Sequence, residues 1–172
     1  MAEALARITE VADLGMIQIR ADLESAGEAI AAAAGVTVPA SGTTSADGAR
    51  RLCWMSPDEL LLVLPRSEVA ATVESLNAAL SSQHALVLDV SDMRAAFAIE
   101  GAKAQQVLMK LCPTDIASMP ENGMRRTRAA QVACGIWRQA DGFTLIGFRS
   151  VGDYLRGLLM GAAQGGTQLE PR

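Results

Sequence analysis

The sequence predicts an α+β fold of two pseudo-repeated β-α-β-β-α lobes with mainly antiparallel sheet, and three observations support this prediction. Half of the 172 residues are hydrophobic and a fifth are charged, so the chain can bury the core of one ordinary domain. Segments that alternate apolar and polar residues, typical of strands, are interleaved with segments of helical period. A spaced pattern of residues also recurs 83 positions later in the chain, which indicates an internal repeat.

The repeat relates a stretch of the first half to a stretch of the second. Its members are Trp54, Asp58, Leu62 and Arg66-Ser67, which return as Trp137, Asp141, Leu145 and Arg149-Ser150. Both stretches have the pattern of strand, turn, strand and helix start, and a strand and a helix precede each of them. We therefore expect a single domain over residues 1–172, with halves at about 14–82 and 85–163 and a frayed tail at 165–172.

The first half is expected to begin with a strand, because residues 16–20 alternate in polarity. Its further elements follow from helical spacing and from Gly, Pro and Ser clusters. In order, they are a helix from Leu23 that ends at Gly35, a Ser/Thr/Gly loop over 39–48, a hairpin of 52–55 and 59–64, and a helix with Val69, Val73, Leu76 and Leu80 buried.

The second half is expected to contain the same series of strand, helix, hairpin and helix. The expected elements are strands at 86–90 and 96–99, a helix with Ala104, Val107, Leu108 and Leu111 inward, strands near 126–131, 132–138 and 143–148, and a last helix burying Val151, Tyr154, Leu155, Leu158 and Leu159. Pro113 should stop the first of these helices because proline cannot continue the hydrogen-bond ladder. Ser150 and Asp153 form a variant of the capping box that should start the second.

Composition limits the function. The net charge of −4 argues against a general nucleic-acid binder. No segment is apolar and long enough for a membrane span, since the longest uncharged run, residues 29–46, is broken by Gly35, Pro39 and Gly42. Three cysteines without metal-ligand spacing fit a reducing compartment, so we expect a cytoplasmic protein. Only six residues are aromatic, so few side chains are available to stack on a flavin or a pterin.

Catalytic groups are scarce. His84 is the only histidine, it lies in a polar connection, and we interpret it as a solvated loop residue. The chain has no glycine-rich phosphate loop. We therefore expect no catalytic, cofactor-binding or metal-binding residue in this chain. Asp89, at a strand end, either forms a turn or faces an amine-bearing ligand, and it remains a weak candidate.

Arg125, Arg126 and Arg128 form the densest positive cluster. In a strand, Arg126 and Arg128 share one face and lie roughly 7 Å apart. This spacing suits carboxylates of a partner surface or an anionic ligand. A solvated edge strand, whose cations discourage aggregation, explains the cluster equally well. These three arginines are the candidate site for a partner or an anion.

An ordered series of short motifs runs along roughly residues 14–160. Its central members are Leu88-Asp89-Val90-Ser91-Asp92-Met93-Arg94, Ile99-Glu100-Gly101-Ala102-x-Ala104 and Leu108-x-Lys110-x-Cys112-x-x-Asp115-Ile116; its outer members include Trp54-x-x-Pro57-Asp58-Glu59, Thr127-Arg128-x-Ala130-Gln131 and Ser150-x-x-Asp153-Tyr154-Leu155. In this order and spacing, the chain resembles the γ subunit family of heterotetrameric sarcosine oxidases. One departure is Ser56, which stands where the family has glycine in a Trp-x-Gly-Pro turn.

The resemblance implies a non-catalytic subunit whose fold is related to the folate-binding aminomethyltransferases. The complex oxidatively demethylates sarcosine to glycine with tetrahydrofolate and O2. FAD, FMN, NAD, tetrahydrofolate and zinc are expected in its other subunits and none in this chain. The partners are the α, β and δ subunits, α most directly, and the γ subunit would help to close the cavity that carries the one-carbon intermediate. The alternative is a stand-alone folate-binding protein or aminomethyltransferase relative.

Overall fold

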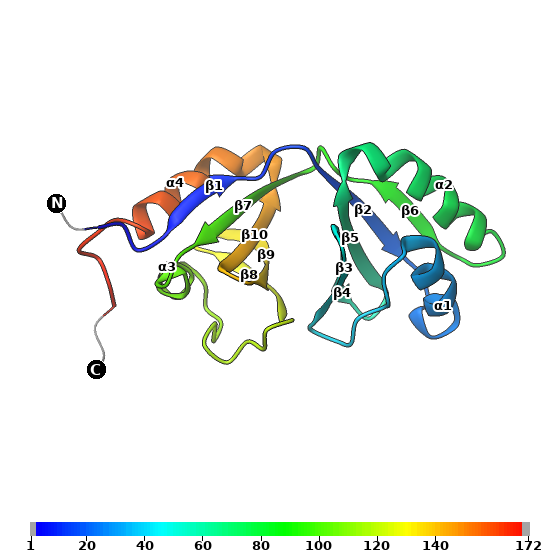
Figure 1. The fold of residues 1–172 in the computed structure, drawn as a ribbon, viewed down its shortest axis with the longest axis horizontal. Helices are drawn as coiled ribbons and strands as arrows, with labels where there is room; N and C mark the ends of the chain where they lie inside the picture. The colour runs from blue at the N-terminus through cyan, green and yellow to red at the C-terminus, as the bar shows by residue number, and fades with distance from the viewer. Residues whose placement is uncertain (1–2, 170–172) are drawn as a thin grey trace. The chain divides into compact units, whose positions relative to one another are not determined.

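The computed structural model describes residues 3–169, which form two compact α+β units. Unit 1 comprises the residues up to Ala12 and those from Asp92 onward, and unit 2 comprises Asp13–Ser91. Each unit holds one five-stranded sheet, and every strand pair is antiparallel. The predicted α+β class with mainly antiparallel sheet is confirmed (Figure 1).

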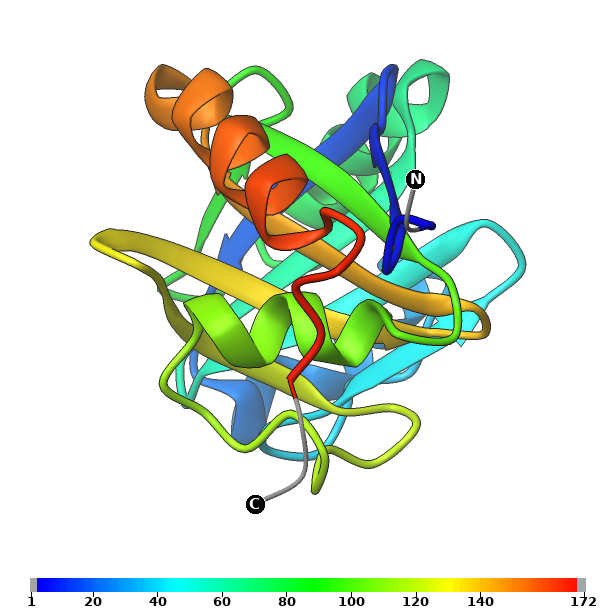
Figure 2. The ribbon, with the colours of Figure 1, turned by 90° about the vertical axis from the view of Figure 1, so that its left-hand side faces the viewer.

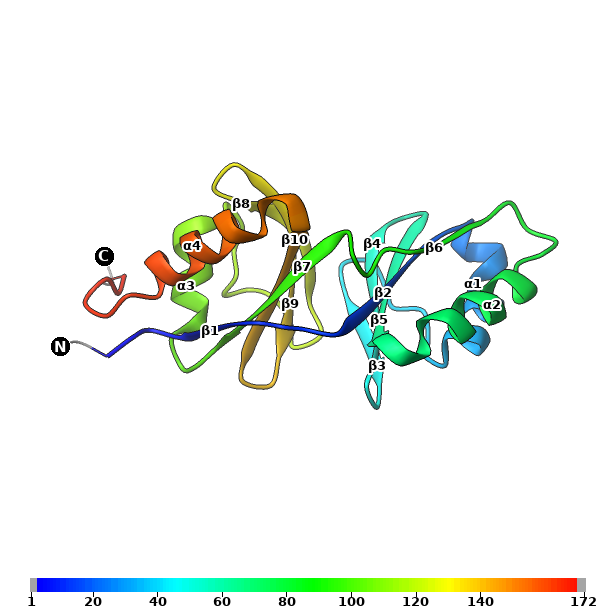
Figure 3. The same ribbon diagram turned by 90° about the horizontal axis from the view of Figure 1, so that it is seen from above.

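Unit 2 has the strand order β3-β4-β5-β2-β6. Its strands and helices are β2 Leu14–Arg20, α1 Leu23–Ala34, β3 Thr44–Asp47, β4 Arg50–Ser56, β5 Glu59–Pro65, the 3-10 turn η1 Arg66–Glu68, α2 Val69–Ala79 and β6 Leu86–Asp89. The helices α1 and α2 pack together against one face of the sheet (Figure 3). Ile17, Ile30 and Leu62 are buried in the core between these helices and the sheet.

Unit 1 has the equivalent order β1-β7-β10-β9-β8. Its elements are β1 Arg7–Glu10, β7 Arg94–Glu100, α3 Ala104–Leu111, β8 Met124–Ala129, β9 Val132–Gln139, β10 Gly142–Phe148, the 3-10 turn η2 Arg149–Val151 and α4 Gly152–Ala162. The helices α3 and α4 cover one face of this sheet (Figure 2). Phe97, Leu108 and Leu145 lie in the core that they enclose.

The edge strands β1 and β6 do not pair with the strands that follow them in the chain. β6 lies next to β7 along the chain but pairs with β2 of unit 2, whereas β1 precedes β2 but pairs with β7 of unit 1. The boundary between the repeats is therefore not the boundary between the units. Residues 86–89, which the sequence assigned to the second half, belong to unit 2, and local sequence patterns carry no information on such long-range pairing.

The predictions for residues 39–48 and for the start of α4 are wrong. Residues 39–48 contain strand β3, which extends the sheet by pairing Thr44 with Cys53, because a polar strand can lie at a sheet edge where only one side is paired. The capping box of Ser150 and Asp153 does not form. Ser150 lies in the turn η2, Val151 is the N-cap residue of α4 without a side-chain bond, and Asp153 pairs with Arg156.

Both ends of α1 and the C-terminal end of α3 follow the usual rules for helix termini. Asp22 caps α1 by accepting a hydrogen bond from the backbone N–H of Glu24, which satisfies one free donor of the first turn. Gly35 ends this helix in the left-handed conformation, with φ 69°, which costs glycine little. The helix α3 ends at Leu111, just before Cys112 and Pro113, as predicted.

The repeated tryptophans are not structurally equivalent. A bulge between Trp54 and Ser56 shifts the register of β4 against β5 by one residue. Trp54 therefore packs against the helix-side core of unit 2, whereas Trp137 lies opposite Thr144 on the other face of the sheet of unit 1. A shift of one residue moves a side chain to the opposite sheet face.

The tail that follows α4 turns back onto α3. Lys110 Nζ donates to Thr167 Oγ1 at 2.7 Å, and the Leu169 N–H donates to Gln106 Oε1 at 2.9 Å. The tail was predicted to fray over 165–172; up to Leu169 it makes these two contacts, and residues 170–172 lie outside the described residues.

Candidate partner-binding surface

The predicted arginine cluster lies on β8, which is an edge strand of unit 1. Arg126 and Arg128 are exposed and share the sheet face opposite the helices, as the strand spacing predicted. Arg125 points to the helix face and donates to the carbonyl of Met124 at 2.9 Å. The structure therefore separates Arg125 from the other two, and a carboxylate bound by Arg126 and Arg128 would lie on the outer edge of the sheet.

Asp89 forms a turn at the end of β6. Its Oδ1 accepts hydrogen bonds from the backbone N–H of Ser91 at 2.9 Å and from the Ser91 hydroxyl at 2.5 Å. Ser91 Oγ in turn accepts from the Met16 N–H at 3.0 Å. The Asp89 carboxylate thus fixes the chain where it leaves unit 2, which is the common role of aspartate in turns.

All three cysteines are free and buried. Cys53 is fully buried in β4, and burial raises the pKa of its thiol to about 12, so it is protonated at neutral pH. Cys112 and Cys134 are buried and hydrogen-bonded to each other. This bond lowers the pKa of Cys112 and raises that of Cys134. Among residues 3–169, no group of three metal-binding side chains occurs, and no helix is long and apolar enough to cross a membrane.

A hollow of about 770 Å³ lies at one end of the sheet of unit 2. His84 lines it and is exposed in the connection before β6, as predicted. Arg20 and Asp58 form an ion pair of 2.5 Å at its rim. The hydrogen bond from Arg20, with a second from Ser56, lowers the pKa of the Asp58 carboxyl below its ordinary value of 3.8.

Because the folded state holds the pKa of Asp58 below 3.8, this carboxylate stabilises the fold above that pH, and its contribution disappears as the pH falls through the lower folded value. We therefore expect Asp58→Asn to lower the melting temperature slightly at pH 6 and the difference from the wild type to shrink as the pH falls. Thermal melts between about pH 6 and pH 3 measure the difference. The control is Asp47→Asn on exposed strand β3, and a difference that grows toward low pH would contradict the prediction.

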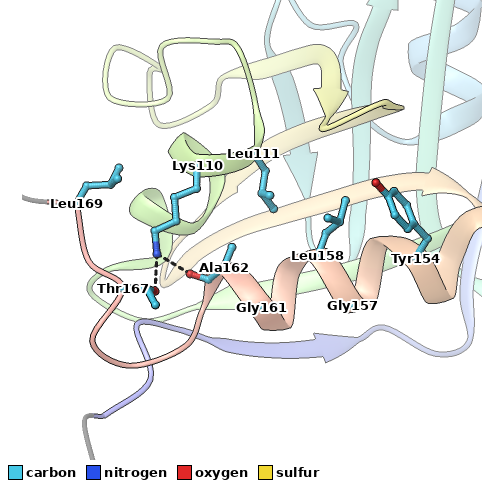
Figure 4. A pocket seen from close by; sticks show the side chains of 9 residues that line it. All are labelled: Lys110, Leu111, Tyr154, Gly157, Leu158, Gly161, Ala162, Thr167 and Leu169. Carbon is cyan, nitrogen blue, oxygen red and sulfur yellow. Dashed lines mark hydrogen bonds between the residues drawn. The ribbon is translucent and has the colours of Figure 1, made fainter.

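An apolar groove of about 720 Å³ lies on unit 1 between α3, α4 and the tail (Figure 4). We call it the α3–α4 groove. Its lining residues are Lys110, Leu111, Tyr154, Gly157, Leu158, Gly161, Ala162, Thr167 and Leu169. On α4, Leu155 and Leu159 face the core, whereas Tyr154 and Leu158 point into the groove. The helix α4 therefore carries two apolar stripes, one for the core and one for the groove.

Lys110 closes one end of the groove. Its ammonium donates to the carbonyl of Ala162 at 2.8 Å and to Thr167 Oγ1 at 2.7 Å (Figure 4). Both acceptors are neutral, and desolvation lowers the pKa of the ammonium. An ammonium has three donors, so these two bonds leave one donor for a further acceptor in the groove.

Tyr154 was expected in the core but is 49% exposed, on the wall of the groove. The helical spacing of the apolar residues predicts one broad stripe on α4, all of it facing the core. The sequence did carry a signal for a second contact surface on α4. Its apolar stripe, with Gly157 and Gly161 beside it, is broader than a single contact with the core needs. Leu111, Tyr154 and Leu158 were predicted as core residues, and the groove that they line was not identified from the sequence.

Comparisons with known proteins agree with the resemblance in the motifs. A family model described as "Sarcosine oxidase, gamma subunit family" matches residues 20–164. The chain is 34% identical over 145 residues to "Sarcosine oxidase subunit gamma" from Corynebacterium sp. (strain U-96). The alignment covers 81% of this chain and 69% of the relative.

Solved structures give the same result. One chain of heterotetrameric sarcosine oxidase from Corynebacterium sp. U-96, solved in complex with pyrrole 2-carboxylate, matches with a TM-score of 0.87 and 29% identity over 97% of this chain and 88% of that chain. Aminomethyltransferase T of the glycine cleavage system from Bartonella henselae matches with a TM-score of 0.70 and 15% identity, over 93% of this chain and 46% of that chain, and shows the fold alone. Family profile, sequence and structure agree over most of the chain, which belongs to the sarcosine oxidase γ subunit family.

Proposed function

We propose that this chain is the non-catalytic γ subunit of a cytoplasmic heterotetrameric sarcosine oxidase. The main support for this proposal is the family match over residues 20–164. The complex would demethylate sarcosine oxidatively to glycine, with O2 and tetrahydrofolate as co-substrates. FAD, FMN, NAD, zinc and the folate site would lie in the α, β and δ subunits, and α would be the main contact of γ.

The side chains of the described residues support an accessory role. Burial raises the pKa of Cys53, and Cys134 is held protonated by its bond to Cys112, so neither supplies a ready thiolate. His84 is exposed beside an ion pair, without a hydrogen-bonded nucleophile to activate. The surface instead offers an apolar groove and a strand with outward arginines, which are features of protein interfaces.

Assembly with the other subunits is the direct test. We expect the tagged chain, isolated from its native host at its natural level, to retain the flavin-containing α and β subunits and the δ subunit in equal stoichiometry. Mass spectrometry identifies the companions, and the flavin absorbance of the eluate measures their amount. Sarcosine oxidation should require the other subunits, so oxidation by the purified γ chain alone would refute the non-catalytic role.

Arg128→Glu tests the contribution of the arginine strand to this assembly. The side chain is exposed on β8, so the melting temperature of the isolated chain should change little. Loss of stability without loss of assembly would assign this arginine to folding.

Titration with tetrahydrofolate, followed by tryptophan fluorescence, tests the stand-alone folate-binding alternative. A saturable change below high micromolar folate would favour that alternative.

A further inference from the structure

We propose that the α3–α4 groove binds an apolar segment of a different subunit of the complex, and that Lys110 pairs with a carboxylate on that segment. The inference rests on the proposed function, because it takes the occupant from the heterotetramer rather than from a second copy of this chain. It adds to that function a docking site, the residues that form it and the chemistry of the segment that fills it.

The shape and polarity of the groove select an apolar occupant. Its walls are formed by the side chains of Leu111, Tyr154 and Leu158, and its floor includes Gly157 and Gly161. A Cβ atom added at either glycine would meet no other heavy atom within 4 Å, so the backbone of α4 is open to close approach. A tyrosine that is 49% exposed beside such a hollow is typical of an interface anchor, since its ring buries a large area and its hydroxyl stays polar.

Charge defines the second requirement. Lys110 lies half-buried at the end of the groove, and its two hydrogen bonds go to neutral oxygens of Ala162 and Thr167. Desolvation lowers its pKa, which means that the site disfavours the charge as it stands. A carboxylate from an incoming segment would accept the third N–H and offset this cost, because a charge-assisted bond is stronger where water is excluded.

The two requirements together describe an amphipathic segment. A helix laid along α4 would place apolar side chains over Gly157 and Gly161 and between Tyr154 and Leu158, and an aspartate or glutamate near its end would reach Lys110. This is the helix-in-groove mode of recognition. The chain matches one subunit of a heterotetramer with a TM-score of 0.87, and this similarity favours a different subunit as the source of the segment.

Gly157→Leu is the critical variant. A Cβ atom added at Gly157 meets no other heavy atom within 4 Å, so leucine can extend into the groove, and leucine has a higher helix propensity than glycine. The melting temperature of the variant should equal or exceed that of the wild type. Its affinity for a purified complex of the host α, β and δ subunits should fall about tenfold or more. Surface plasmon resonance with the γ chain immobilised measures this affinity. Ala70→Leu on the exposed face of α2 is the matched control and should bind as the wild type does.

Lys110→Met tests the carboxylate. Wild-type affinity should decrease when the salt concentration is raised, because salt screens a partly exposed ion pair. The variant should bind more weakly at low salt and should lose most of this salt dependence. An unchanged salt response would show that Lys110 meets no charge in the complex and would overturn this part of the proposal.

The remaining outcomes separate the two proposals. If the wild type assembles and Gly157→Leu assembles equally well, the groove is not the docking site, while the proposed function stands. If the wild type does not bind the other subunits at all, both proposals are wrong. If the isolated chain forms dimers that Gly157→Leu abolishes, the occupant is a second copy, and the inference of a different subunit is overturned.

Discussion

Gly142→Ala is expected to lower the free energy of unfolding by about 3 kcal/mol. Gly142 opens β10 with a φ of 152°, and a Cβ atom added there would lie 2.0 Å from the carbonyl oxygen of Ile99 on the neighbouring strand. Two costs combine, because alanine disfavours this backbone conformation and because the obstacle is backbone that cannot move without opening the pairing of β7 with β10. Urea denaturation followed by far-UV circular dichroism measures the loss.

Gly48→Ala is the matched control for this substitution. Gly48 also has a positive φ, 55°, but an added Cβ atom meets nothing within 4 Å. Only the backbone cost applies, and we expect a loss of about 1 kcal/mol. Equal losses in the two variants would show that the contact with Ile99 relaxes and contributes nothing.

Phe97→Ala is expected to destabilise the chain by about 3–5 kcal/mol, the usual cost of removing a buried phenylalanine. Phe97 is 1% exposed in the core of unit 1, on strand β7, which pairs with both β1 and β10. The lost ring would leave a cavity that β7, held by a strand on each side, cannot fill by moving. Amide exchange should accelerate most along β7 and β10.

Phe148→Ala tests whether the cost of removing a phenylalanine depends on the burial of its ring. Phe148 lies on the same sheet but is 45% exposed, and its ring contacts the Arg94 guanidinium at 5.4 Å. We expect a loss of about 1 kcal/mol or less, since an exposed cation–π contact stabilises weakly. If Phe148→Ala destabilised as much as Phe97→Ala, exposed fraction would not explain the cost of either substitution.

Local patterns in the sequence determined most of the secondary structure. The helical spacing from Leu23 and the glycine at position 35 predicted α1 with its end, and Pro113 predicted the end of α3, as the structure shows. These features depend on the backbone preferences of a few neighbouring residues. The antiparallel α+β class and the family resemblance were also readable, because the repeat and the ordered motifs span most of the chain.

The candidate site was readable only in part. The shared face of Arg126 and Arg128 follows from the period of a strand and was predicted. The α3–α4 groove was not, because it depends on how α4, α3 and the tail meet around Lys110. Tyr154 has the helical spacing of a core residue, and only the packed structure shows which apolar stripe of α4 is covered.

The sequence by itself determined the α+β class, most of the helices and strands, and membership of a family. The tertiary structure decided which strands pair, since β6 and β1 join the sheets of opposite repeats. It also decided that Trp54 and Trp137 occupy different sheet faces, because a single bulge shifts the register. Helix and turn preferences act over a few residues, whereas strand pairing and groove formation depend on contacts between segments far apart in the chain, which the hydrophobic pattern of each segment leaves open.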